Sequence, residues 1–149
     1  SRVLVDAFRR LEVDAYLSEG SPSFLSKTNN PCFSFPTPNE LEVGGKKVVG
    51  SAQKRNNKAL LQHGSIPVTM DYQLYADGTH SRPAIISRSM TTLSEVSDKT
   101  RNDLAAALIE SFRNFIGQPL ETFEFNREDK KAIEKIEIKY RSQDWNFSL

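Results

Sequence analysis

Three side chains in the first half of the sequence belong to types that carry out covalent or acid–base chemistry. Cys32 is the only cysteine and lies in a segment rich in proline and serine, Lys47 follows a Gly-Gly pair, and His63 precedes a glycine. A cysteine thiolate is a nucleophile, a lysine ammonium stabilises negative charge, and histidine exchanges protons near neutral pH. Because single cysteines and histidines are also common packing residues, the surrounding sequence has to decide between the two interpretations.

The sequence around Lys47 predicts a pair of strands. Leu41 and Val43 alternate with glutamates, which is typical of a half-buried strand, and Gly44-Gly45 is a two-residue hairpin turn. Successive residues of a strand point to opposite faces, so one of Lys46 and Lys47 is expected to point inward. We assign that inward position to Lys47, at the start of the return strand.

A segment with very little side-chain volume follows the return strand: Gly50, Ser51, Ala52 and then Gln53. Small residues in a strand let another group approach the backbone closely. A basic turn at residues 54–58 leads to a third strand over residues 60–68, which carries His63 and Gly64. We expect an antiparallel meander in which the small-residue segment and His63-Gly64 lie on adjacent strands.

Helices are predicted on both sides of these strands. Apolar residues recur at helical spacing over residues 2–10 and predict an amphipathic helix. Thr92, Thr100 and Asn126 are typical helix-capping residues, and each precedes a segment with helical periodicity. Residues 72–75 are expected instead to pair briefly as a strand and to be followed by a turn.

Length and composition predict one domain over residues 1–149 and restrict its partners. The net charge is +1, yet five basic residues and no acid lie between Gly44 and Met70. This basic set is small and has no helix to enter a groove, so nucleic-acid binding is not expected. No metal-ligand spacing is present. No apolar run approaches the roughly 20 residues that cross a bilayer, and one cysteine suits a reducing compartment, so we expect a cytoplasmic protein without membrane contact.

The stretch NELEVGGKKVVGSAQKRNNKALLQHGSIPV, residues 39–68, resembles the core of the lipoate and octanoate transfer enzymes. This superfamily contains lipoate–protein ligases and cysteine-dependent octanoyltransferases and is related to the biotin–protein ligases. Its specific pattern is K-x-x-G-S-A-Q followed by L-Q-H-G-S. The resemblance implies an α+β fold with a mostly antiparallel sheet packed with helices. It also implies that Lys47 contacts the acyl group, and that the substrate-binding strands carry Gly50, Ser51, Ala52, Gln53, His63 and Gly64.

The segment Pro31-Cys32-Phe33 is similar to the cysteine segment of the octanoyltransferases, which also precedes the N-E-L strand. The resemblance implies that Cys32 and Lys47 are catalytic and that no cofactor is needed. An octanoyl group would pass from acyl carrier protein through a cysteine thioester to a lysine of a lipoyl domain. Two alternatives remain open. One is a lipoate–protein ligase that uses ATP and Mg²⁺, with Cys32 as a bystander, and the other is a non-catalytic partner half that recognises lipoyl domains.

One family motif has no counterpart in the chain. The family carries an Arg- and Gly-rich segment of the type R-R-x-S-G-G-x-x-V-x-H, which forms the other wall of the acyl tunnel. The first predicted helix starts where the middle of the family's domain is expected. The chain therefore resembles the C-terminal portion of the catalytic fold, and we expect an upstream segment or a second chain to supply the other half.

Overall fold

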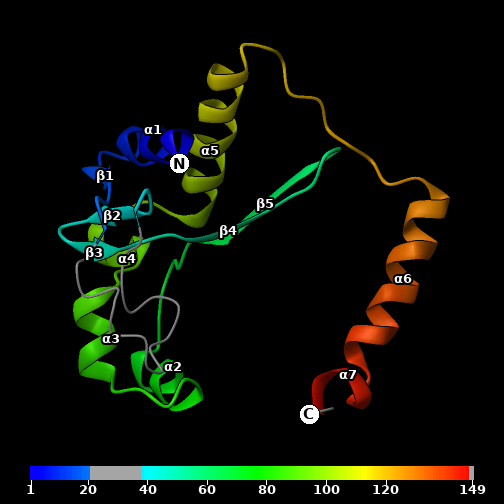
Figure 1. The fold of residues 1–149 in the computed structure, drawn as a ribbon. Helices are drawn as coiled ribbons and strands as arrows, with labels where there is room; N and C mark the ends of the chain where they lie inside the picture. The colour runs from blue at the N-terminus through cyan, green and yellow to red at the C-terminus, as the bar shows by residue number, and fades with distance from the viewer. Residues whose placement is uncertain (21–37, 148–149) are drawn as a thin grey trace. The chain divides into compact units, whose positions relative to one another are not determined.

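The computed structural model describes residues 1–20 and 38–147, which divide into two units, Ser1–Gln118 and Pro119–Leu149 (Figure 1). The elements of the first unit are, in chain order, α1 (Arg2–Arg10), β1 (Ala15–Leu17), β2 (Leu41–Val43), β3 (Lys46–Lys47), β4 (Gly50–Arg55), β5 (Leu60–Ser65), α2 (Tyr72–Gly78), α3 (Pro83–Ser89), α4 (Leu93–Val96) and α5 (Arg101–Ile116). The second unit contains α6 (Arg127–Arg141) and α7 (Gln143–Phe147). This mixture of helices and small antiparallel sheets confirms the predicted α+β class, whereas the single-domain assignment stays a prediction.

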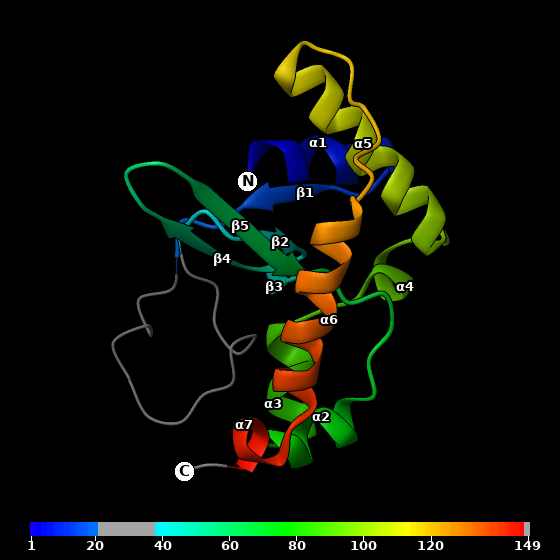
Figure 2. The ribbon, with the colours of Figure 1, turned by 90° about the vertical axis from the view of Figure 1, so that its right-hand side faces the viewer.

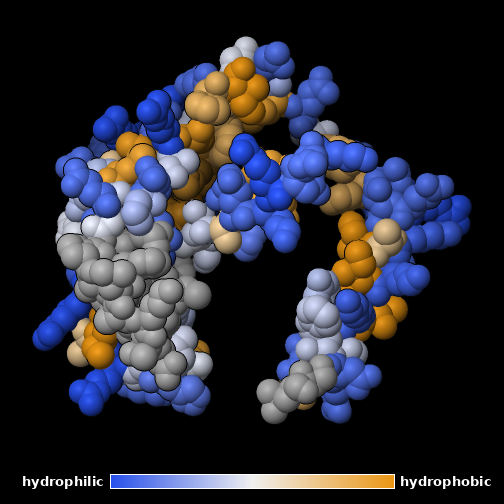
Figure 3. Space-filling view, viewed as in Figure 1, coloured by the Kyte–Doolittle hydropathy of each residue, from blue (hydrophilic) through white to orange (hydrophobic). Residues whose placement is uncertain are grey.

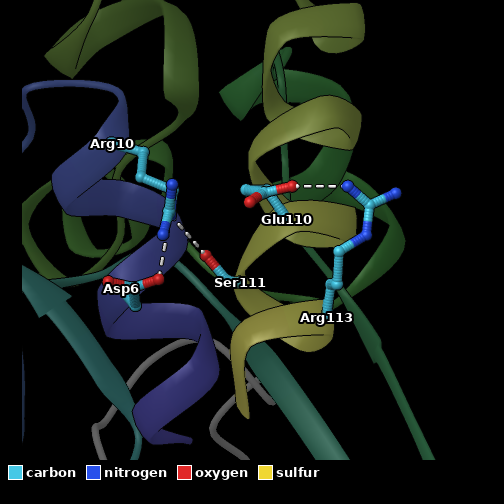
Figure 4. A network of polar contacts seen from close by, with 5 residues as sticks. All are labelled: Asp6, Arg10, Glu110, Ser111 and Arg113. Carbon is cyan, nitrogen blue, oxygen red and sulfur yellow. Dashed lines mark hydrogen bonds and ion pairs between the residues drawn. The ribbon is translucent and has the colours of Figure 1, made fainter. Parts of the chain in front are cut away.

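The first unit is built on helices α1 and α5, which lie side by side (Figures 1 and 2). Phe8 of α1 and Leu104 of α5 are buried in one hydrophobic cluster. Beside this cluster, Arg10 Nε donates hydrogen bonds to Asp6 Oδ2 at 2.9 Å and to Ser111 Oγ at 3.1 Å (Figure 4). Apolar burial and this polar link therefore fix α1, the helix predicted from the sequence, against α5.

Strands β1, β2 and β3 form an antiparallel sheet with β2 at its centre. The turn between β2 and β3 is Gly44-Gly45, and both residues have positive φ, at 57° and 76°. Glycine adopts this conformation without steric cost, which confirms the predicted two-residue hairpin. One face of the sheet carries Ala15 and Leu41 into the same hydrophobic cluster as α1 and α5.

Strands β4 and β5 form a second sheet, a two-stranded hairpin that extends away from the first (Figure 1). The predicted single meander is therefore wrong. Val48 N still donates to Leu41 O of β2 at 3.0 Å, but Val48 and Val49 are buried in the core between β3 and β4, which belong to different sheets. The predicted basic turn is also narrower, since β4 continues through Arg55. Within the hairpin, Ser51 pairs with Gly64 and Ala52 with His63, which confirms that these segments lie on adjacent strands.

The segment after β5 folds into helices. Residues 72–75 belong to α2, so the predicted strand is wrong; the side chain of Asp71 accepts a hydrogen bond from Leu74 N at 3.0 Å and caps the helix. Helices α2 and α3 pack around Ala76, Ile86 and Met90. The predicted caps at Thr92, Thr100 and Asn126 are all confirmed as capping boxes that begin α4, α5 and α6.

Gly64 allows the two strands of the hairpin to approach each other. A Cβ atom at this position would lie 2.7 Å from the backbone oxygen of Gly50. We expect Gly64→Ala to destabilise the hairpin by about 1–3 kcal/mol, because the added methyl group cannot be accommodated without a backbone shift. Hydrogen exchange of the β4 and β5 amides should then become faster. Gly78→Ala is the control, since its Cβ would meet no atom within 4 Å; equal exchange in both variants would contradict the steric argument.

Candidate functional site

Lys47 points into the protein. Its side chain is only 4% exposed, whereas Lys46 beside it is half-buried. This difference confirms that strand alternation turns Lys47 inward. Burying an ammonium group is costly unless other groups compensate its charge, so the surroundings of Lys47 require an explanation.

Two neighbouring segments hold the backbone of Lys47. On one side, β2 pairs with β3 in a register that places Glu42 opposite Lys47. On the other side, Thr91 N donates a hydrogen bond to Lys47 O at 2.9 Å, next to a parallel bridge between Met90 and Lys47. Because both edges of this short strand are paired, the Lys47 side chain starts from a fixed position.

Glu40 compensates the charge of Lys47. The distance between Lys47 Nζ and Glu40 Oε1 is 2.8 Å, and the Glu40 side chain is 12% exposed. Ser18 N donates to the backbone oxygen of Glu40 at 2.8 Å, which extends the pairing of β1 and β2 to this residue. Glu40 is not among the site residues predicted from the sequence, although the two-residue turn places Glu42 opposite Lys47 and Glu40 two residues further along the same face.

The hairpin of β4 and β5 is open to solvent along almost its whole length. All its residues after Gly50 are exposed, including His63. Gln53 Nε2 donates to Gln62 Oε1 at 3.1 Å across the two strands. These strands therefore present accessible backbone and small side chains within a few residues of the buried Lys47.

The structure brings together most of the residues that the sequence indicated as a site. The predicted substrate-binding residues share the hairpin: Gly50, Ser51, Ala52, Gln53, His63 and Gly64. Lys47 precedes this group by three residues in the chain. Cys32 lies outside the described residues. The catalytic and binding roles of all these residues stay predictions.

A polar network supports the segment that pairs with Lys47. Glu95 accepts hydrogen bonds from Thr91 Oγ1 and from the Tyr72 hydroxyl, both at 2.8 Å. Burial of the Glu95 carboxyl opposes its ionisation, but these bonds outweigh that effect and lower the pKa of Glu95. Burial and the same contact raise the pKa of Tyr72 to about 12. The network links α2 and α4 to Thr91, whose backbone holds Lys47.

Two other kinds of feature are not found in the described part of the chain. Within residues 1–20 and 38–147, no group of three or more His, Cys, Asp or Glu side chains is placed to hold a metal ion. None of the helices in these ranges combines the length and apolar composition that a membrane crossing needs.

The fold is α+β, and it places a buried lysine directly ahead of an open hairpin of small residues. The family model described as the lipoyl protein ligase A/B catalytic domain matches residues 1–113. The chain is 33% identical to the octanoyltransferase LipM of Kyrpidia tusciae and 29% identical to that of Bacillus subtilis, with 99% of the chain covered in both. It therefore belongs to the lipoyl protein ligase A/B catalytic domain family.

Solved structures of ligases share the fold. A Thermoplasma acidophilum protein with bound lipoic acid has a TM-score of 0.76 at 19% identity, and lipoate-protein ligase A bound with ATP has 0.76 at 18% identity. They cover 99% and 97% of this chain, and 56% and 55% of their own lengths. The chain likewise spans 59% of the length of the two LipM relatives.

The Glu95 network should make stability depend on pH in the acid range. Because folding lowers the pKa of Glu95 from 4.5, its stabilising effect is complete above that value and is lost as the pH falls through the lowered pKa. Glu95→Gln should therefore melt below the unchanged chain at pH 7, and the difference should shrink in acid. Tyr72→Phe removes one of the hydrogen bonds and should give a smaller difference of the same kind. A melting difference that grows with acidity would contradict this assignment.

Proposed function

We propose that this chain is the acyl-transferring part of an octanoyltransferase, which moves an octanoyl group from acyl carrier protein to a lysine of a lipoyl domain. The observation that carries the proposal is the buried Lys47 just ahead of an open, small-residue hairpin, in a chain similar to LipM octanoyltransferases over nearly its whole length. One cysteine suits the reducing conditions of the cytoplasm, and this location is part of the proposal.

The first step is transfer of the octanoyl group to Cys32. The Cys32 thiolate attacks the carbonyl carbon of the octanoyl thioester on the carrier protein. A bond to Cys32 Sγ forms, the bond to the carrier's sulfur breaks, and the carrier's thiolate leaves and takes up a proton. The octanoyl group is then held on Cys32 as a thioester.

Lys47 stabilises the negative charge that develops on the acyl oxygen during this attack. Its ammonium is held in place before the reaction, so little reorganisation is needed when the charge appears. Backbone N–H groups near Gly50 and Ser51 add hydrogen bonds to the same oxygen. The neighbouring strand, with His63 and Gly64, forms the other side of the acyl-binding surface.

The second step forms the product amide. The neutral amine of the acceptor lysine attacks the thioester carbon, the bond to Cys32 Sγ breaks, and the amine loses its proton. Exchange of a thioester for an amide is downhill, so the proposal requires neither ATP nor another cofactor. The partners are acyl carrier protein, a lipoyl-domain protein and the part of the fold that the LipM relatives have in addition.

The alternative is an ATP-dependent lipoate–protein ligase. It is favoured by the shared fold of lipoate-protein ligase A, which was solved with ATP. In that reaction ATP and Mg²⁺ would activate the carboxylate, Lys47 would contact the acyl-adenylate, and Cys32 would take no part. A non-catalytic partner half that recognises lipoyl domains would bind them without transferring an acyl group.

Lys47→Ala should lower octanoyl transfer about 100- to 1000-fold, since removal of a charge-stabilising donor typically raises the barrier by about 3–4 kcal/mol. Lys46→Ala is the matched control and should be nearly neutral, because it lies one residue away on the other face. Octanoyl transfer is measured with the supplemented chain, that is, this chain together with the part of a LipM relative that this chain does not span. Circular dichroism verifies that both variants fold, and equal, small effects would refute the assignment of Lys47.

Cys32 distinguishes the two enzyme reactions. With octanoyl-acyl carrier protein, the supplemented chain should form a covalent octanoyl adduct on Cys32 that hydroxylamine removes, as it does other thioesters. Cys32→Ser should lose both adduct and turnover, because a hydroxyl is far less acidic than a thiol. Mass spectrometry of the intact protein after one turnover measures the adduct. Full activity of Cys32→Ser with strict dependence on ATP and Mg²⁺ would establish the ligase instead.

A further inference from the structure

The far end of the β4–β5 hairpin concentrates positive charge. Lys54, Arg55 and Lys58 are all exposed, and no acid occurs between Gly44 and Met70. Within the part of the chain that the structure describes, none of the ion pairs involves these three residues. Figure 3 shows hydrophilic side chains over the hairpin. We call Lys54, Arg55 and Lys58 the basic tip.

The basic tip is held in a defined conformation. Strand pairing continues to its end, where Arg55 lies opposite Leu60. In the turn, Asn56 N donates to Ala59 O at 3.0 Å, and Asn56 Oδ1 accepts from Lys58 N at 2.9 Å and from Ala59 N at 2.7 Å. A turn ordered in this way fixes the backbone under the three cations before any partner arrives, which lowers the entropy cost of binding.

Apolar side chains accompany the charges on both faces of the hairpin. Leu60 and Leu61 are 53% and 61% exposed, opposite Arg55 and Lys54 respectively. Directly opposed residues share a face of a sheet, so each face carries one cation beside one leucine. A protein that docks on the tip of the hairpin would bury this exposed apolar surface beside the charges.

We propose that the basic tip is the docking surface for the acidic protein surface around the acceptor lysine, an inference that rests on the proposed function. Lys54 lies two residues, or about 7 Å along the strand, from Ala52 in the acyl-binding segment. A lysine side chain is short, so its own domain must come close to the acyl group. The thioester arm of a carrier protein is long, so the body of the donor can stay further away. The proximity of the basic tip therefore favours the acceptor.

The test compares two charge reversals of equal size. Lys54→Glu with Arg55→Glu alters the basic tip, and Lys130→Glu with Lys131→Glu alters two exposed residues of α6. The probe is an acidic lipoyl domain without its acyl group, and its binding to the supplemented chain is measured by fluorescence anisotropy. We expect the tip variant to raise Kd about tenfold or more and the control to leave it nearly unchanged. The difference should shrink between about 0.05 M and about 0.5 M salt, where charges are screened.

Kinetic measurements separate this inference from the proposed reaction. The tip variant should raise KM for the lipoyl domain and leave transfer from a small octanoyl thioester to Cys32 unchanged. Transfer with an unaltered KM in the tip variant would overturn the docking surface while the reaction stands. Binding that depends on the tip, without any octanoyl transfer, would leave the docking surface and refute the reaction. No binding by the unaltered chain, an equal loss in the α6 control, or tighter binding of RNA than of the lipoyl domain would each overturn the inference.

Discussion

The burial of the Lys47 ammonium beside Glu40 is the constraint on which the first sheet depends. An ion taken out of water loses several kcal/mol of solvation, and removing one partner of such a pair typically costs about 3–5 kcal/mol. Glu40 precedes β2 and Lys47 lies on β3, so their distance of 2.8 Å depends on the register of these strands. The Gly44-Gly45 turn sets that register, because one residue more or fewer would turn Lys47 to the opposite face.

The break between the two sheets separates a rigid part from an accessible part. Val48 and Val49 are buried in the core and anchor the chain directly after Lys47. Beyond them the hairpin of β4 and β5 leaves the core, and its backbone is reachable from solvent. The proposed transfer would use both properties, because electrostatic stabilisation works best with a cation fixed in advance, whereas a protein substrate needs open surface. Because Val48 and Val49 are buried between Lys47 and the hairpin, one short stretch of sequence contains a fixed cation and an open surface.

Local signals in the sequence predicted the parts of the fold that local interactions determine. The Gly44-Gly45 turn and the cap of α5 at Thr100 each involve residues only a few positions apart, and both are confirmed. Residues 72–75 were misassigned because alternating apolar residues favour a strand, while the cap by Asp71 was overlooked. The partner of Lys47 was missed because it depends on side-chain reach as well as register. No local signal relates Cys32 to Lys47, since the eight residues between Cys32 and β2 include Pro36 and Pro38 and show no regular periodicity.

The apolar stripe of helix α5 is buried at its N-terminal end and exposed at its C-terminal end. Its apolar stripe runs evenly through Leu104, Leu108, Phe112 and Phe115. Leu104 is 5% exposed and packs near α1, but Phe112 is 44% and Phe115 70% exposed, and the outer end of the helix is visibly apolar (Figure 3). Periodicity reports the surface that a helix offers for packing, whereas burial also needs a neighbour at that place. The first half of the stripe has such a neighbour in α1 and is buried or partly buried. The second half follows the same apolar periodicity but is exposed.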